Sequence, residues 1–135
     1  MDFATNYDEL SEIVSRNIPL ARSAEEFLSI LKSSNTPEYL KDSVSILNRA
    51  SSEELLDFSR TLEFKDGMLG HANYNSIGAH LHNEEEVLKI WEIFGIGSVM
   101  ASGTVDYFCK LGHLDEPKKC VKNKGSFCGS LICQN

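Results

Sequence analysis

The sequence is defined first by what it lacks. Its first 108 residues contain no cysteine, and no stretch approaches the roughly 18 apolar residues that a membrane-spanning helix needs, so we expect no transmembrane segment. The first ten residues, MDFATNYDEL, have no basic cluster followed by an apolar run. They do not match a secretory signal peptide, so we expect the chain to be cytoplasmic as synthesised. The net charge of −7 argues against a nucleic-acid partner, because phosphate neutralisation needs clustered Lys and Arg.

The patterns that usually mark an active site are also missing. The sequence has no phosphate-cradling glycine loop, no paired-carboxylate pattern and no zinc-protease histidine spacing. Cys109 and His113 alone do not form a nucleophilic site, because such a cysteine also needs an orienting group and a turn that presents it. We therefore expect no enzymatic activity and no cofactor. His71, His80 and His82 are expected to be surface or core-edge histidines.

Helix-capping patterns dominate residues 1–97. Ser23 and Ser51 each precede a glutamate by three residues, which is the spacing of a capping box, and Asn83 precedes three glutamates. Apolar residues follow these caps at helical spacing. We predict that residues 6–62 and 83–94 are largely helical and that Ile90, Trp91 and Phe94 are buried. The glycine-rich segment 65–82 is predicted to be a loop.

These patterns predict an all-α fold, a small domain of four to five helices followed by an irregular tail rich in Cys, Gly and Ser. The charge is unevenly divided, with a net +2 in residues 98–135 and the remaining −9 in residues 1–97. We therefore divide the chain into an acidic helical domain, 1–97, and a basic tail, 98–135. The tail is expected to pack less tightly, because it has few periodic apolar positions.

All four cysteines lie in that tail, at positions 109, 120, 128 and 133. In a cytosolic chain such a cluster more often indicates metal, redox or modification chemistry than a disulfide. One alternative is a zinc site with ligands among Cys109, His113, Cys120, Cys128 and Cys133. The spacings between these residues lack the two tight Cys-x2-Cys units of a zinc ribbon.

The other alternative is that the tail is chemically modified. Thr104, Ser126 and Ser130 each precede a cysteine by a few residues. Dehydration of Ser or Thr gives an electrophilic alkene, to which a cysteine thiolate adds to close a thioether ring. Short separations keep the entropy cost of closing such rings low. We predict these three hydroxyl residues as dehydration sites and the four cysteines as the thiols that react with them.

Two short motifs resemble a known family. Leu111-Gly112-His113 with residues 123–128, NKGSFC, and the ending Cys133-Gln134-Asn135 are similar to the core of class II lanthipeptides, specifically the alpha peptides of two-component systems. Gly129-Ser130-Leu131-Ile132 stands where the family has the Thr-Leu-Thr-x-Glu-Cys segment that grips a cell-wall precursor.

The resemblance implies an N-terminal leader, a cleavage point and a dehydrated, cyclised antimicrobial core that is exported. It implies a modifying dehydratase-cyclase and a protease or transporter as partners.

Two functional hypotheses therefore follow from the sequence. The first is a precursor of a lanthipeptide-like bacteriocin, with a helical leader 1–97 and a modifiable core 98–135. The second is a small all-α cytosolic protein-interaction module whose cysteine tail is structural or binds zinc. The first predicts loss of water from the product, whereas the second predicts a chain of unchanged mass.

Overall fold

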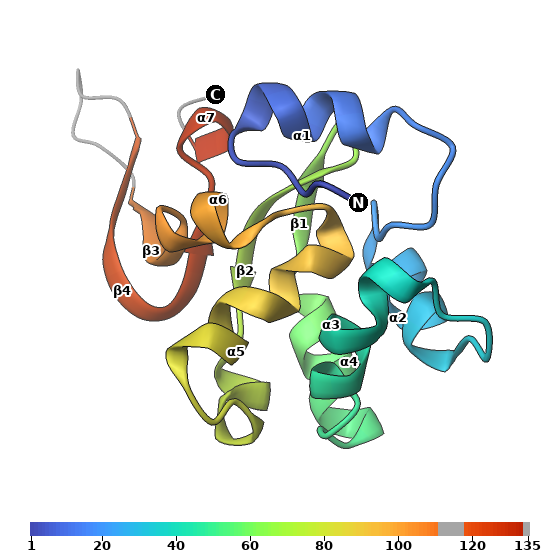
Figure 1. The fold of residues 1–135 in the computed structure, drawn as a ribbon. Coiled ribbons are helices and arrows are strands. Elements are labelled where there is room, and N and C mark those ends of the chain that lie inside the picture. Colours follow the sequence, from blue (N-terminus) through green and yellow to red (C-terminus); the bar gives the residue numbers. More distant parts are fainter. Residues whose placement is uncertain (111–117, 134–135) are drawn as a thin grey trace.

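The structure, a computed structural model, describes residues 1–110 and 118–133. In this part of the chain, short helices surround a twisted antiparallel sheet (Figure 1). The helices, with η for 3-10 turns, are α1 Tyr7–Val14, α2 Ala24–Lys32, η1 Glu38–Leu40, α3 Lys41–Leu47, α4 Ser52–Arg60, η2 Asn75–His80, α5 Glu84–Lys89, η3 Ile90–Phe94, α6 Ser98–Ser102 and α7 Ser130–Cys133. The strands are β1 Glu63–Lys65, β2 Met68–Asn73, β3 Val105–Lys110 and β4 Lys119–Cys128.

The predicted all-α fold class is wrong, because the chain folds as an α+β protein. The four strands form one sheet in the order β1-β2-β4-β3, and every neighbouring pair is antiparallel. In Figure 1 the helices α2 to α5 gather at one end of β1 and β2, while α1 lies across the other end. The hairpin of β3 and β4 projects to one side.

The first missed strands form a hairpin over residues 63–73, most of which lies in the segment 65–82 that is predicted to be a loop. Lys65 pairs with Met68, so only Asp66 and Gly67 connect β1 to β2. Both connecting residues have positive φ, 53° and 80°. This is the geometry of a type I′ turn, which Asp-Gly favours, because neither position penalises the left-handed conformation. The dipeptide was therefore a sequence signal for two strands.

The predicted caps at Ser23, Ser51 and Asn83 are confirmed, although the box at Ser23 is half formed because Glu26 accepts from the Arg22 amide instead. The Asn6, Ser23 and Asn83 side chains each accept a hydrogen bond from the backbone amide three residues later. Ser51 and Glu54 form a complete, reciprocal capping box at the start of α4. The longest described α-helices have nine residues, so none within 1–110 and 118–133 is long enough to cross a bilayer.

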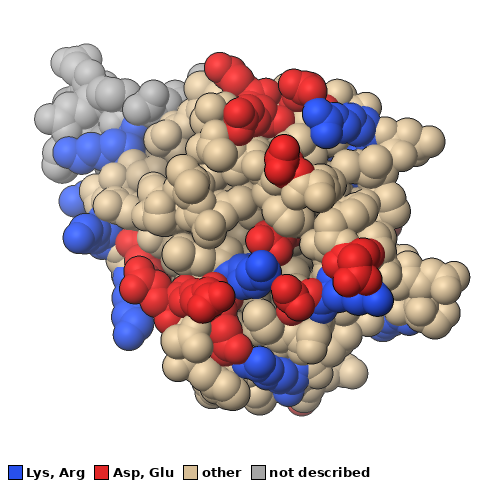
Figure 2. All heavy atoms as spheres, viewed as in Figure 1, with Lys and Arg blue, Asp and Glu red and all other residues tan. Residues whose placement is uncertain are grey.

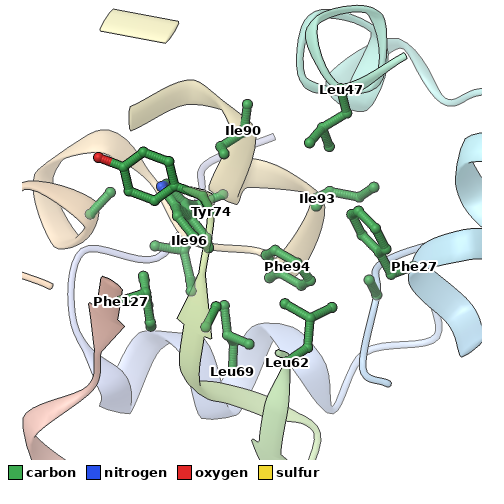
Figure 3. Packing of buried hydrophobic residues seen from close by; sticks show 14 of the residues in the cluster. Phe27, Leu47, Leu62, Leu69, Tyr74, Ile90, Ile93, Phe94, Ile96 and Phe127 are labelled. Carbon is green, nitrogen blue, oxygen red and sulfur yellow. The ribbon is translucent and has the colours of Figure 1, made fainter. Parts of the chain in front are cut away.

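The core is built around Trp91, which is fully buried together with Ile90 and Phe94, as predicted. Its indole ring contacts the ring of Phe127 from β4, with ring centroids 4.8 Å apart. On the other side of the core, Phe27 of α2 stacks on Phe94 at a centroid distance of 5.6 Å. Figure 3 shows Phe27, Phe94 and Phe127 converging on one cluster from α2, η3 and β4. The helical part and the sheet thus share one apolar core.

The prediction of an irregular tail is also wrong. Residues 105–110 and 119–128 are strands, and residues 125–129 are buried. Gly129 packs so closely on α1 that a Cβ there would collide with the Tyr7 hydroxyl, and Gly70 is similarly covered by Ile132. The tail was misjudged because these glycines permit close packing, whereas the sequence suggested flexibility.

Candidate functional site

The hairpin of β3 and β4 carries most of the residues that the sequence singled out. We call β3 together with residues 118–124 the hairpin arm. In the arm, Phe108 pairs with Val121, Cys109 with Cys120 and Lys110 with Lys119. Further along, the register of β3 and β4 shifts between Lys122 and Phe127, and residues 126–128 of β4 pair with β2 while Phe127 still pairs with Val105 of β3. Strand β4 therefore bends between its two partners, and it forms the hook seen in Figure 1.

A partly buried polar contact holds this bend. The Asp106 carboxylate accepts hydrogen bonds from the Gly125 amide (2.9 Å) and from the Tyr74 hydroxyl (2.7 Å). The Tyr74 amide in turn donates to the Gly125 carbonyl at 2.7 Å. Asp106 and Gly125 have φ of 67° and 97°. Burial, and then the Asp106 carboxylate, raise the pKa of Tyr74 well above its usual range, so its hydroxyl keeps its proton. No local pattern in the sequence predicts this contact.

All four cysteines are joined in disulfides, contrary to the expectation from their clustering. Cys109–Cys133 links β3 to α7, and Cys120–Cys128 links the two ends of the bent strand β4. The Cα atoms of the two pairs are 5.6 and 5.8 Å apart. The bend at Gly125 brings Cys120 and Cys128 together, because eight residues of straight strand would hold them far apart.

The four cysteines of the predicted zinc site are oxidised to disulfides in the structure. The Sγ atoms of Cys109, Cys128 and Cys133 lie within 4.8 Å of one another, and no other group of potential metal ligands is found in 1–110 and 118–133. Zinc binds thiolates, so this group has no free ligand while both disulfides are intact. His113, the fifth predicted ligand, lies outside the described residues.

The three predicted dehydration sites lie in different surroundings. Thr104 is buried, and its hydroxyl donates to the Met100 carbonyl at 3.1 Å. Ser126 is also buried, and its Oγ accepts a hydrogen bond from the Asn123 side chain at 3.2 Å. Ser130 is exposed at the start of α7. In the folded chain, only Ser130 is open to a modifying enzyme.

The histidines lie at the edge of the core and on the surface, as predicted. His80 contacts Glu54 at 2.9 Å, and the largely exposed His82 lies 3.8 Å from Glu86. His71 is half-buried, and its ring meets the edge of Phe108 at a centroid distance of 5.7 Å. With Cys109 and Cys133 it lines a pocket of about 190 Å³ beside the first disulfide.

The hairpin arm also concentrates positive charge. Lys110, Lys118, Lys119, Lys122 and Lys124 are all exposed, and none forms an ion pair with an acid in the described chain. Figure 2 shows basic side chains along the edge of the molecule where β3 and β4 lie, beside acidic side chains over α5. Asp106 is the only acid among the described residues of the arm, and its carboxylate already accepts hydrogen bonds from Tyr74 and Gly125.

The cations of the helical part are mostly neutralised instead. Five of them, Arg16, Lys41, Arg49, Arg60 and Lys89, lie 2.6 to 3.8 Å from an acid. The most charged hollow lies between α3 and α5, where Arg49 binds both carboxylate oxygens of Glu86 at 2.8 Å. That hydrogen bonding lowers the pKa of Glu86 to about 2. Because these charged groups already pair with one another, the hollow leaves few unpaired groups that could bind a ligand.

An apolar contact point completes the arm. The Phe108 ring is 41% exposed, and its cross-strand partner Val121 is half-buried. Because opposite residues of an antiparallel pair share a face, and i and i+2 do as well, Lys110 and Lys119 flank this pair on the same side of the hairpin. An apolar centre with a cationic border is typical of a protein-binding surface.

No family model, curated protein or solved structure matches the chain. Its function therefore has to be inferred from its own geometry.

Proposed function

We propose that the protein is a non-catalytic binding module that holds an acidic segment of a partner protein against its hairpin arm. The observation that carries this proposal is the set of five exposed arm lysines without an acidic partner in the described residues. On a chain of net charge −7, unneutralised lysines at one place repel each other and raise the local potential. A binding partner of opposite charge relieves that repulsion and is steered to the arm.

The arm is also stiff enough to present this charge in one arrangement. Its strands are joined to each other by a ladder and to the rest of the chain by both disulfides and the Asp106 contact. Phe108 supplies apolar area at the centre of the surface. A rigid surface loses little conformational entropy on binding, so more of the interaction energy appears as affinity.

Lysines at an exposed strand edge have a second possible role, which is to prevent sheets from joining edge to edge. That protection depends on the presence of charge, and glutamate provides it as well as lysine does. Binding of an acidic segment depends on the sign of the charge. Charge reversal therefore separates the two roles.

The experiment uses a fluorescein-labelled peptide of ten glutamates as the probe and fluorescence anisotropy as the readout. We expect binding that weakens as salt is raised. Lys110→Glu with Lys119→Glu, the two lysines on the Phe108 face, should weaken it by about tenfold or more, because two attractions become repulsions. The matched control is Lys32→Glu with Lys65→Glu, which changes the net charge equally at two exposed lysines outside the arm.

An equal loss in both double variants would mean that the probe senses net charge alone, and this would refute the proposal. Equal affinity for a short DNA duplex would also count against an acidic protein segment as the partner. Aggregation of the arm variant without loss of probe binding would identify the lysines as edge protection.

The precursor hypothesis stays a separate prediction. The proposal of a binding module is favoured over it by the burial of Thr104 and Ser126 and by the pairing of all four thiols. The intact mass of the native product, before and after reduction and alkylation, distinguishes the two. A shortened chain that has lost water and resists reduction supports the precursor, and four alkylations on an unshortened chain exclude it.

The sequence and the disulfides point to different cellular locations. Cytoplasmic synthesis with possible export of a product remains the expectation from the sequence. The two disulfides favour an oxidising compartment for the folded protein, since such bonds are reduced in most cytosols.

A further inference from the structure

The four cysteines fall into two pairs by burial. Cys109 and Cys120, the outer pair, are half-buried in the hairpin arm, and Cys128 and Cys133, the inner pair, are buried beneath it. Each disulfide joins one outer to one inner cysteine. The two disulfides also touch, since the Cys128 sulfur lies within 4.8 Å of the sulfurs of both Cys109 and Cys133.

This arrangement permits a second complete pairing. Cys109 and Cys120 are direct partners in the β3–β4 ladder. Such residues have Cα atoms about 4.5 to 5.5 Å apart, which a disulfide can span. The inner sulfurs of Cys128 and Cys133 are already neighbours. Outer–outer and inner–inner bonds are therefore both within reach of small side-chain movements.

We propose that the cluster is a thiol–disulfide exchange site, at which a low-molecular-weight thiol converts the present pairing into Cys109–Cys120 and Cys128–Cys133. The thiolate attacks the half-exposed Cys120 sulfur, a mixed disulfide forms, and the electron pair of the broken bond leaves on Cys128. The Cys128 thiolate attacks Cys133, which breaks the Cys109–Cys133 bond and leaves the electron pair on Cys109. The Cys109 thiolate then attacks Cys120 and returns the small thiol.

The sequence of steps is balanced. Three bonds form and three break, the small thiol is recovered, and nothing is oxidised or reduced overall. The small thiol can instead attack Cys109 first. Cys133 then leaves and attacks Cys128, Cys120 is released and attacks Cys109, and the same two disulfides result. The buried inner thiolate is an unstable intermediate in an apolar site, so its capture by the adjacent disulfide is favoured over release.

Exchange changes how the arm is attached. At present both disulfides join the arm to cysteines outside it, Cys128 of β4 and Cys133 of α7. After exchange, one bond closes the arm on itself and the other joins β4 to α7. The disulfides then no longer join the arm to residues outside it, and the arm is held by the chain at Thr104 and Gly125 and by the Asp106 contact. A small thiol therefore controls the stiffness of the surface that carries the lysines.

Trypsin can distinguish the two pairings directly, because Lys119, Lys122 and Lys124 separate the cysteines. The full chain is incubated without denaturant with sub-stoichiometric reduced glutathione, blocked with N-ethylmaleimide, digested and analysed by mass spectrometry without reduction. The present pairing gives one species that joins peptides 90–110, 120–122 and 125–135. The exchanged pairing gives peptide 90–110 joined to 120–122, and peptide 125–135 with an internal disulfide.

We expect the three-peptide species to fall and both exchanged products to rise together after addition of the thiol. If the set of disulfide-linked peptides stays unchanged over hours with the thiol, the proposal is overturned, whichever pairing those peptides show. The matched control is Cys109→Ser with Cys133→Ser, in which Cys120–Cys128 has no neighbouring disulfide to attack. Its single pair, 120–122 joined to 125–135, should stay unchanged within each chain, and new links between chains in it would show that exchange is intermolecular.

Discussion

The helical part of the molecule and the hairpin arm are held together by different forces. Residues 1–97 contain Trp91 and a set of fully buried rings, including Phe27, Phe58 and Phe94. The C-terminal region places one aromatic ring, Phe127, in the described core, and it has two disulfides. Segments that cannot build their own core are commonly stapled in this way. The comparison teaches that the arm depends on a few cross-links, whereas the helical part depends on many apolar contacts.

The strongest test of this comparison is Phe127, the ring by which β4 enters the core of the helical part. Phe127→Ala should lower the free energy of unfolding by about 3 to 5 kcal/mol, because it leaves a cavity against Trp91. Phe108→Ala is the control and should cost less than about 1 kcal/mol, since that ring is 41% exposed. Urea denaturation followed by tryptophan fluorescence measures both. Similar losses in the two variants would mean that Phe127 does not connect the arm to the core.

Removal of either disulfide should weaken the arm by less. Cys109→Ser with Cys133→Ser opens a loop with a sequence separation of 24 and should lower the arm's opening free energy by about 3 kcal/mol. Cys120→Ser with Cys128→Ser, with a separation of 8, should cost about 1 kcal/mol less, because a shorter loop restricts the unfolded chain less. Hydrogen exchange should accelerate in residues 105–124 and stay slow at α2 and α4. Uniform acceleration throughout the chain would contradict the division.

The bend in β4 should be the next most sensitive feature. Asp106→Ala removes the acceptor of two hydrogen bonds and leaves the buried Tyr74 hydroxyl unpaired, so we expect a loss of about 1 to 3 kcal/mol. Asp106→Asn keeps one acceptor oxygen and tolerates positive φ, so it should lose less than the alanine variant. Thermal unfolding of the three proteins in parallel gives the order. A stability of the alanine variant equal to that of the asparagine variant would show that the carboxylate does not hold the bend.

The smallest effect is a pH dependence confined to the helical part. Hydrogen bonds from Arg49 hold the pKa of Glu86 at about 2, below the usual value near 4.5. A carboxylate with a depressed pKa adds stability that is present above pH 4.5 and is lost as the pH falls toward 2. Glu86→Gln should therefore be less stable than the wild type at pH 6, and the difference should shrink between pH 4.5 and 2. Urea titrations at several pH values measure it, and a difference that grows on acidification would have the wrong sign.

The sequence predicted the helices better than the sheet, for a physical reason. Caps at Ser23, Ser51 and Asn83 are local, since a side chain meets an amide three residues away, and all three are confirmed. The β1–β2 hairpin was also locally encoded, by Asp66-Gly67, and was overlooked. The pairing of β2 with β4 is different, because it joins His71 to Cys128 across the chain. No spacing within a short window reports such a contact.

The candidate site divides in the same way. The excess of lysine in the tail was visible as a charge count, and it leads to the proposed binding surface. The disulfide pairing and the Asp106–Tyr74 contact depend on a bend at Gly125 that brings residues of β4 back on themselves. A single glycine in a sequence does not predict a bend, because glycine is equally common in flexible segments.

The β2–β4 pairing has a consequence for how the chain reaches this fold. The helices and the Asp66-Gly67 hairpin involve neighbouring residues and can form early, whereas the β2–β4 ladder must close a loop of more than fifty residues. Since Phe127 enters the core on that strand, the ring of Trp91 stays partly solvated until the ladder closes. Refolding followed by tryptophan fluorescence should therefore show its main change late, after most of the helical circular dichroism has already returned.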